Sequence, residues 1–224
     1  MAIVLDTTTA DGIGSGTSMS WSHTCNTNFL VVCIGLFRDG GTTSVTGITY
    51  NGDALTKAVG VSAQEGGANK YRRSEIWYKI NPAQGANTVS ATISGSANTT
   101  FGRSMSFSGV NISDALEDTG YDNANSQQTS GEFDATATKA NSLFVDSLEA
   151  DIGNINNPSS PARTGFYELN DSGDSESSGI SYKTDVAIGA ATYTYPTDGG
   201  SRYLCYSGAI FNPAPAGNRG YIIC

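Results

Sequence analysis

The chain has 224 residues, a formal net charge of −9 and only 15% charged residues, while glycine (27 residues), Ser, Thr and Asn are abundant. This turn-rich composition is typical of an all-β protein rather than a helical one, and the length is sufficient to bury a core without disulfide or metal staples. The 12 Lys and Arg look scattered along the sequence, which argues against nucleic-acid binding. No polybasic or amphipathic segment points to a membrane surface.

The N-terminal segment, Met1 to Asp6, has neither the positive charge nor the apolar length of a signal peptide. The four cysteines are Cys25, Cys33, Cys205 and Cys224. Cys25 and Cys33 fall on expected neighbouring strands, where a bridge is geometrically feasible. The lack of a signal peptide favours the other reading, in which the cysteines are free thiols in the core.

A short first strand is expected at Ile3–Leu5, followed by a flexible loop at Gly12–Gly16. Met19–Cys25 then alternates apolar and polar residues, which predicts a strand with one buried face. His23, the single histidine, shares the parity of the buried side. We therefore expect it to be a core or boundary residue rather than a catalytic base.

Phe29–Phe37 (FLVVCIGLF) is the longest apolar run in the chain. It is too short to cross a bilayer as a helix, which takes about 20 residues. It is rich in β-branched and aromatic residues and has turn-like segments on both sides. Because a strand that is apolar on both sides must be covered on both faces, we expect this strand in the interior of a sheet.

Asn51-Gly52 separates two alternating runs, Ser44–Tyr50 and Ala54–Val59. This dipeptide predicts a hairpin, because both central residues of the tight turn need a positive φ. The next expected elements are strands at Tyr71–Ile80, Val89–Ile93 and Phe101–Phe107, a turn at Asn81–Gly85 and a polar loop at Gly95–Asn98.

The segment Asp114–Gly131 is poor in apolar residues and is expected to be a long loop or crossover. After it, the pattern of the first half returns weakly: an alternating strand and a short polar turn lead into the apolar run Leu143–Leu148. The endings of the two halves also correspond, with residues 89–93 and 101–110 echoed by 191–195 and 202–211. Between these segments we expect an exposed loop (Asp151–Ser160), a short strand (Phe166–Leu169) and an acidic tip (Asp171–Ser178).

About a dozen short strands without a convincing helix predict an antiparallel β-sandwich, jelly-roll-like, with a C-terminal extended arm. The sandwich domain is expected at residues 1–211. Residues 212–224 read as a Pro/Ala-rich linker and an apolar arm, because Pro213 and Pro215 cannot continue a ladder. The candidate protein-interaction residues are those of the arm tip, Arg219, Tyr221, Ile222 and Ile223. The alternative is a last edge strand that folds back on its own domain.

No catalytic constellation is evident. His23 lies mid-strand, and no G-x-S-x-G nucleophile elbow is present. Glu75 and Glu65 could be considered as the carboxylate pair of a glycosidase, but Glu75 is flanked by Arg72 and Arg73, and a surface ion pair explains it better. We expect no enzyme and no cofactor.

No metal site is expected either. The sequence has no Cys-x-x-Cys or Cys/His cluster. Asp171, Asp174 and Glu176 bring oxygen ligands together, but their spacing matches no calcium loop, and a solvated loop tip is the better reading.

Two motifs carry a family resemblance: V-T-G-I-T-Y-N-G-D-A-L-T-K (Val45–Lys57) and W-Y-K-I-N-P-A-Q-G-A-N-T-V (Trp77–Val89). With the surrounding residues, about 17 to 110, the chain resembles β-sandwich proteins encoded by tailed bacteriophages and found in bacterial and environmental genomes. The resemblance carries no catalytic residue over. It implies a virion structural protein, most simply a capsid decoration (cement) protein that binds and stabilises the head surface, assembled in the host cytoplasm. It also implies the major capsid protein or other virion subunits as partners and a homo-oligomer, such as a trimer.

Two other functions stay open at this point. One is a carbohydrate- or receptor-binding module of a phage tail fibre or bacterial surface adhesin, since jelly rolls often bind sugars, although a fold does not define a function. The other is a self-polymerising surface filament.

Overall fold

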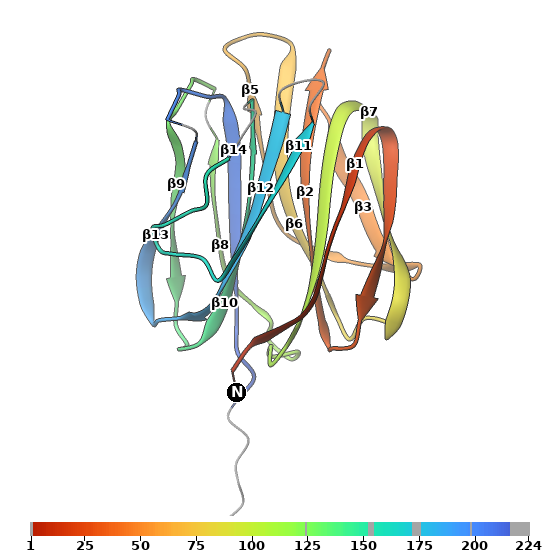
Figure 1. Ribbon diagram of the computed structural model, residues 1–224, viewed down its shortest axis with the longest axis vertical. Helices are drawn as coiled ribbons and strands as arrows, with labels where there is room; N and C mark the ends of the chain where they lie inside the picture. The colour runs from red at the N-terminus through yellow and green to blue at the C-terminus, as the bar shows by residue number, and fades with distance from the viewer. Residues whose placement is uncertain (1, 124, 152–154, 172–175, 198, 216–224) are drawn as a thin grey trace, which may run out of the picture.

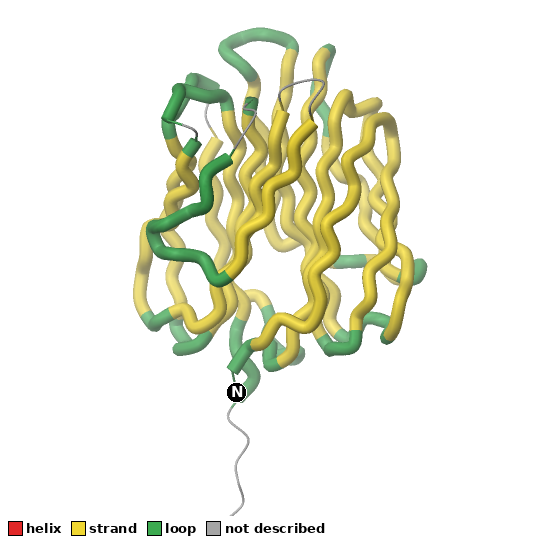
Figure 2. The backbone as a smooth tube through the Cα atoms, viewed as in Figure 1, coloured by secondary structure: helices red, strands yellow, loops and turns green. Residues whose placement is uncertain are grey.

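The computed structural model describes residues 2–123, 125–151, 155–171, 176–197 and 199–215, and the regular elements within them are all strands (Figures 1 and 2). In chain order these are β1 (Val4–Cys25), β2 (Phe29–Asp39), β3 (Ser44–Tyr50), β4 (Asp53–Ala54), β5 (Thr56–Gln64), β6 (Lys70–Ile80), β7 (Gly85–Ser108), β8 (Leu116–Asn123), β9 (Ser130–Ala137), β10 (Ser142–Ala150), β11 (Gly165–Asp171), β12 (Glu176–Val186), β13 (Gly189–Pro196) and β14 (Leu204–Phe211).

All the strand pairs are antiparallel, as expected for a β-sandwich. A seven-stranded sheet has the order β4-β3-β7-β2-β6-β5, with β1 paired to β7. A five-stranded sheet has the order β11-β12-β10-β14-β8, and β13 pairs with β9 alone. The all-β, antiparallel sandwich-like fold is confirmed.

The two longest strands, β1 and β7, fold the first sheet over on itself. The first part of β1, Val4 to Gly14, pairs with Thr100–Ser108 of β7, and its last part pairs with Gly85–Thr92. Gly16 and Gly95, with φ of 97° and 70°, lie where the two strands change layer. One layer then contains β2, β6 and β5 and the other β3 and β4, which is a jelly-roll-like arrangement.

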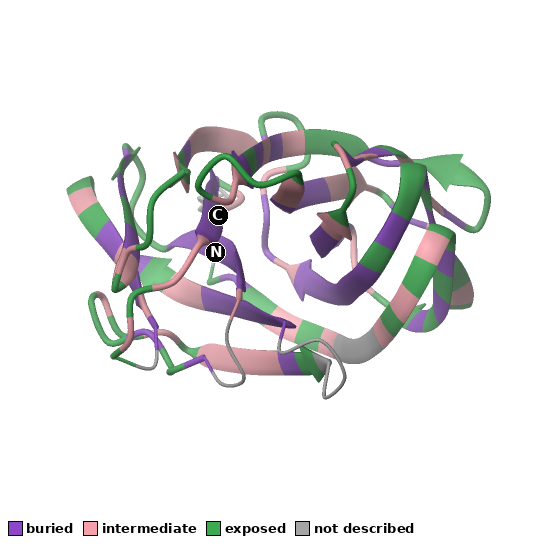
Figure 3. Ribbon diagram, turned by 90° about the horizontal axis from the view of Figure 1, so that it is seen from above, coloured by how far each residue is buried: buried purple, intermediate pink, exposed green. Residues whose placement is uncertain are grey.

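The second half of the chain, β8 to β14, repeats the arrangement of the first half, β1 to β7, with shorter strands. β8 and β9 take the places of the two parts of β1, and β13 and β14 take those of β7. The pairs β8–β14, β14–β10, β10–β12, β12–β11 and β9–β13 therefore reproduce those of the first half. The internal repeat predicted from the sequence is present in the strand pairing, and the two halves stand side by side in Figures 1 and 3.

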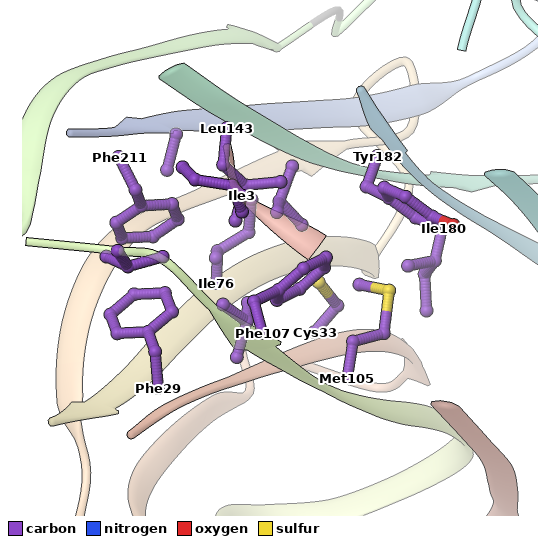
Figure 4. Close-up of a cluster of buried hydrophobic side chains, with 14 of the residues drawn as sticks. Ile3, Phe29, Cys33, Ile76, Met105, Phe107, Leu143, Ile180, Tyr182 and Phe211 are labelled. Carbon is purple, nitrogen blue, oxygen red and sulfur yellow. The ribbon is translucent and has the colours of Figure 1, made fainter. Parts of the chain in front are cut away.

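Each half has its own hydrophobic core, and a third core joins the halves. The first core includes Trp21, Leu30, Val32 and Trp77, and the second core lies around Phe133 and Tyr206 of the second half. The shared core contains residues from both halves, as Figure 4 shows for Phe29, Cys33, Met105, Phe107, Leu143, Ile180 and Phe211.

β2 lies at the border of two cores, as its sequence predicts. It is interior to its sheet, between β7 and β6. Val31 and Cys33 face the shared core, while Val32 and Ile34 face the first core. Every residue from Phe29 to Phe37 is buried.

Two loop predictions are wrong, because both segments form part of a strand. Gly12–Gly16 lies within β1 and Gly95–Asn98 within β7. Gly12 has a packing role: a Cβ there would stand 2.0 Å from Met19 Cε and 3.2 Å from the Trp21 ring, so the glycine leaves room for both side chains to cover the strand. Register shifts on both sides of Gly16 absorb the bend that the sequence suggested as a loop.

The predicted crossover at Asp114–Gly131 is also partly wrong, because it contains the edge strand β8. Its polar residues have a structural use. The carboxylate of Asp118 accepts a hydrogen bond from Thr136 N (2.7 Å), and that of Asp122 accepts one from Glu132 N (3.0 Å). These carboxylates satisfy two backbone amides on the outer edge of β9, a role that a hydrophobic pattern does not reveal.

Cys25, Cys33 and Cys205 are free and buried. Cys25 belongs to the first core and Cys33 to the shared core, on opposite faces of the sheet, so the bridge considered for this pair does not form. Cys224 lies outside the described residues.

The start of the predicted arm is attached to the body. Asn212 N donates to Ala115 O (2.8 Å) and Ala214 N donates to Gly109 O (2.7 Å). The arm-tip residues, Arg219, Tyr221, Ile222 and Ile223, lie outside the described residues.

Candidate functional site

Glu75 and Glu65 do not form a carboxylate pair. They lie on opposite sides of the β5–β6 layer: Glu75 accepts a hydrogen bond from Trp77 Nε1 (2.8 Å) of the first core, whereas Glu65 pairs with Arg72, which also binds Glu176 of the second half. Because the two groups face different cores, they have no common space for a glycosidic bond.

Glu75 is an ion-pair residue, but the surface location expected for it is wrong. Its side chain is 0% exposed and contacts Arg73 Nε and Lys57 Nζ, the latter at 2.7 Å. Arg72, the other predicted partner, points to the opposite side of β6. A buried carboxylate with two cationic partners and further hydrogen bonds is compensated for its loss of water.

The position of Glu75 follows from a gap in strand pairing. β3 pairs with β4 only at Thr49 and Tyr50, and β5 pairs with β6 instead of β3. Among the described strands, none therefore pairs with the first residues of β3 on this side. Glu75 Oε1 fills the place of a partner by accepting a hydrogen bond from Val45 N (3.2 Å).

A polar cavity of about 200 Å³ opens beside this gap. Its lining residues are Thr42, Thr43, Ser44, Ser62, Tyr71, Arg73 and Ser94, and we call it the Arg73 pocket. Ser44 Oγ and Ser94 Oγ hydrogen-bond to each other (2.9 Å), and Thr43 Oγ1 donates to Ser94 O (3.0 Å), so one wall is fixed.

Several polar groups of the pocket are available to a ligand. Arg73 uses Nε on Glu75, and its terminal nitrogens make no hydrogen bond to any described residue. The hydroxyls of Ser62 and Tyr71 likewise have no partner in the described part of the chain. The pocket thus offers one fork of cationic donors and two uncommitted hydroxyls.

The pocket lies in the basic part of an acidic chain. Half of the 12 Lys and Arg fall between residues 38 and 79, with only four of the 21 Asp and Glu. These basic residues are Arg38, Lys57, Lys70, Arg72, Arg73 and Lys79. The sequence prediction that basic residues are scattered is therefore wrong. This clustering, with the hydroxyl run Thr42–Ser44, was the sequence signal that could have located the pocket.

A larger cleft, of about 480 Å³, lies on the second half along β8 and β9. Its lining includes Asp122, Gln128 and Glu132. Asp122 already accepts a backbone hydrogen bond from Glu132, and Ser130 Oγ donates to Glu132 Oε1 (3.3 Å). Its acidic groups are thus committed to holding two strands together.

A further group of buried charges lies between the halves. Arg72 donates from Nη2 to both oxygens of Glu176 (2.7 and 2.8 Å) and also pairs with Glu65. Burial raises the pKa of Glu176 to about 7, although Arg72 opposes the shift. Glu149 is 0% exposed, and burial, with the nearby charge of Glu176, raises its pKa well above the ordinary value. We assign this cluster to the contact between the halves, because Arg72, Glu149 and Glu176 are buried there.

The acidic tip predicted at Asp171–Ser178 is wrong at its C-terminal end, where Glu176 and Ser177 are buried. Asp174 and the side chain of Asp171 lie outside the description. Within the described ranges, no group of three or more His, Cys, Asp or Glu side chains is placed to hold a metal ion.

His23 is buried, as expected, and burial lowers its pKa to about 4 against the opposing charge of Asp6.

Among the residues described, none belongs to a helix long and apolar enough to cross a membrane. Comparison of the chain with protein-family models, with curated proteins and with solved structures gives no match.

Proposed function

We propose that this chain is a structural protein of a tailed-phage virion, most simply a capsid decoration protein that binds the major capsid protein or other virion subunits as a homo-oligomer such as a trimer. The resemblance of residues 17–110 to phage-encoded sandwiches motivates the proposal. The observation that carries it is that Ala2 and Ala214, close to the two ends of the described chain, both lie beside Gly109. Ala2 O would stand 2.3 Å from a Cβ at Gly109, and Ala214 N donates to Gly109 O (2.7 Å).

This end of the body, at the bottom of Figure 1, is suited to attachment. Val4 is 56% exposed and Ile112 is 39% exposed there. Burying such a side chain fully stabilises a complex by roughly 1.5–3 kcal/mol, so one copy would bind weakly. Several copies held in one oligomer would bind more strongly through effective concentration.

The test is to locate the protein and count its copies in purified virions by mass spectrometry. Hundreds of copies per particle are expected for decoration of the head, whereas a few to tens indicate a fibre. Absence from the particle would refute the virion role.

A binding assay to heads that lack the protein then tests the attachment end. Val4→Ser with Ile112→Ser, and truncation after Pro215, should each reduce occupancy without lowering the melting temperature. Ile13→Ser is the matched control, because Ile13 is 53% exposed on the same strand as Val4 but nine residues away, about 30 Å along β1. Equal occupancy for all variants would contradict attachment through this end.

The second candidate is a carbohydrate- or receptor-binding module of a tail fibre or a bacterial adhesin. The Arg73 pocket favours it, because a small cavity lined by hydroxyls and one guanidinium suits a polar ligand. The copy number in virions separates the two candidates, since a fibre module is present in small numbers.

A further inference from the structure

We infer that the Arg73 pocket binds a hydroxylated carboxylate, namely an acidic sugar residue of a surface polysaccharide. The inference goes beyond the virion proposal and does not depend on it, since the pocket lies on β5, β6 and the start of β3, away from the chain ends.

The size of the pocket limits its ligand. Its volume is about 200 Å³. Pockets for drug-sized ligands measure about 300–1,000 Å³. The Arg73 pocket therefore fits a single ring of sugar size rather than an oligosaccharide or a nucleotide.

The charge of the pocket favours one negative group on that ring. Glu75 has two cationic partners, Lys57 and Arg73, so the cluster keeps a positive charge. With its Nε held by Glu75, the Arg73 guanidinium is fixed in direction while its terminal nitrogens remain uncommitted. Such a fork binds a carboxylate through two parallel hydrogen bonds.

The hydroxyls account for the rest of the ligand. Ser62 Oγ and Tyr71 OH can each donate and accept a hydrogen bond, as sugar hydroxyls do. The fixed wall formed by Ser44 and Ser94 needs no rearrangement on binding. The chain carries −9 overall, so the positive cluster at the pocket is a local exception, and one negative group on a small ring is the charge that it matches.

The experiment is calorimetric titration of the full chain with glucuronate, glucose and acetate at low salt. We expect glucuronate to bind in the millimolar range or tighter, at least tenfold more tightly than either glucose or acetate. Added salt should weaken glucuronate binding, because the pair is charge-assisted and partly exposed. Equal binding of acetate would show that the hydroxyls contribute nothing, and equal binding of glucose would show that Arg73 contributes nothing. Either result, or no binding of glucuronate, overturns the inference.

Variants assign the contacts. Arg73→Gln should remove the preference for glucuronate over glucose, and Tyr71→Phe and Ser62→Ala should weaken both sugars. Lys79→Gln is the charge-matched control, because Lys79 lies on the same strand β6 but pairs with Asp53 (3.8 Å) and does not line the pocket. If Arg73→Gln fails to fold because Glu75 loses a partner, the glucuronate affinities of Tyr71→Phe and Ser62→Ala test the proposal instead. Unchanged glucuronate affinity in both of these would overturn the proposal.

The methyl glycoside of glucuronate separates a polysaccharide residue from a free sugar acid. A chain-linked residue has its anomeric oxygen blocked, as the methyl glycoside does. Affinity within about threefold of free glucuronate supports a polysaccharide ligand. Loss of binding overturns that assignment.

Discussion

Glu149→Gln should make the protein more stable at neutral pH, and the gain should grow with pH. Glu149 lies on β10 with both carboxyl oxygens buried, and neither has a hydrogen-bond partner among the described residues. A Cβ at Gly35 of β2 would stand 2.3 Å from Glu149 Oε2, so the carboxyl is pressed against the first half. Burial first, and the charge of Glu176 second, raise the pKa of Glu149, while Arg72 opposes them.

The sign and size of the effect follow from proton linkage. Unfolded Glu149 loses its proton near pH 4.3, whereas the folded protein keeps it to higher pH. Between these two pKa values the folded state binds more protons, so stability falls as pH rises, by up to about 1.36 kcal/mol per pH unit. From pH 5 to pH 7 the wild type should lose up to about 2.7 kcal/mol through this group, and the neutral amide should not.

The assay is urea unfolding of the wild type and Glu149→Gln at pH 5, 6 and 7, with the urea dependence of the unfolding free energy compared to confirm that the same surface is exposed. The difference between the two proteins cancels the titration of His23 and of other groups distant from Glu149, and it retains the titration of Glu149 together with its coupled neighbour Glu176. Glu132→Gln, at an exposed position of β9, controls for the loss of one negative charge. If the difference between wild type and Glu149→Gln is the same at all three pH values, Glu149 is ionised in the folded protein and the reasoning fails.

Val31→Asp should cost on the order of 3 kcal/mol or more, because it places a carboxyl in the shared core; an unchanged melting temperature would contradict the position of β2 between two cores. Gly35→Ala should destabilise by about 1–3 kcal/mol in denaturant unfolding, because the new Cβ meets Glu149 and Ser178, and Gly47→Ala, where a Cβ has open space, is its control. For His23, whose pKa is lowered to about 4, protonation favours the unfolded state, so stability should fall as pH drops from about 6.5 towards 4. A His23 resonance that titrates near pH 6.5 in the folded protein would refute this.

The parts of the fold that the sequence predicted well are those where burial follows a simple period. β2 is apolar on both parities and is covered on both faces. Asn51 and Gly52 both have positive φ, 53° and 83°, as their hairpin requires. The second strand of this hairpin is only the two-residue β4, because the chain then leaves β3 and pairs with β6 as β5.

The elements that were missed depend on distant partners. The carboxylates of β8 bond the edge of β9, and β1 continues through Gly12, which Met19 and Trp21 cover. A local pattern contains neither kind of information.

The candidate site was missed for a similar reason. Arg73 and Ser62 lie on adjacent strands β6 and β5, but Ser44 and Ser94 reach them only through the gap beside β3. Glu75 was expected at the surface because the neighbouring Arg72 and Arg73 suggested a solvent-exposed ion pair. The alternation along β6 instead sends Arg72 and Arg73 to opposite cores, which could have been deduced from the parity of Ile76 and Trp77.

The pairing of β1 with β7 also determines when this protein can fold during synthesis. Val4 pairs with Ser108, a partner 104 residues away, so the first half cannot close until that residue has left the ribosome. Contacts this distant in sequence slow folding, because a long loop must close before they form. The closed first half would still expose the apolar face that becomes the shared core, until β10 pairs with β14 at the end of the second half. During that interval the nascent chain exposes a hydrophobic surface that is prone to aggregation. We therefore expect the yield of folded protein to depend on chaperones and on temperature more strongly than the stability of the finished fold would suggest.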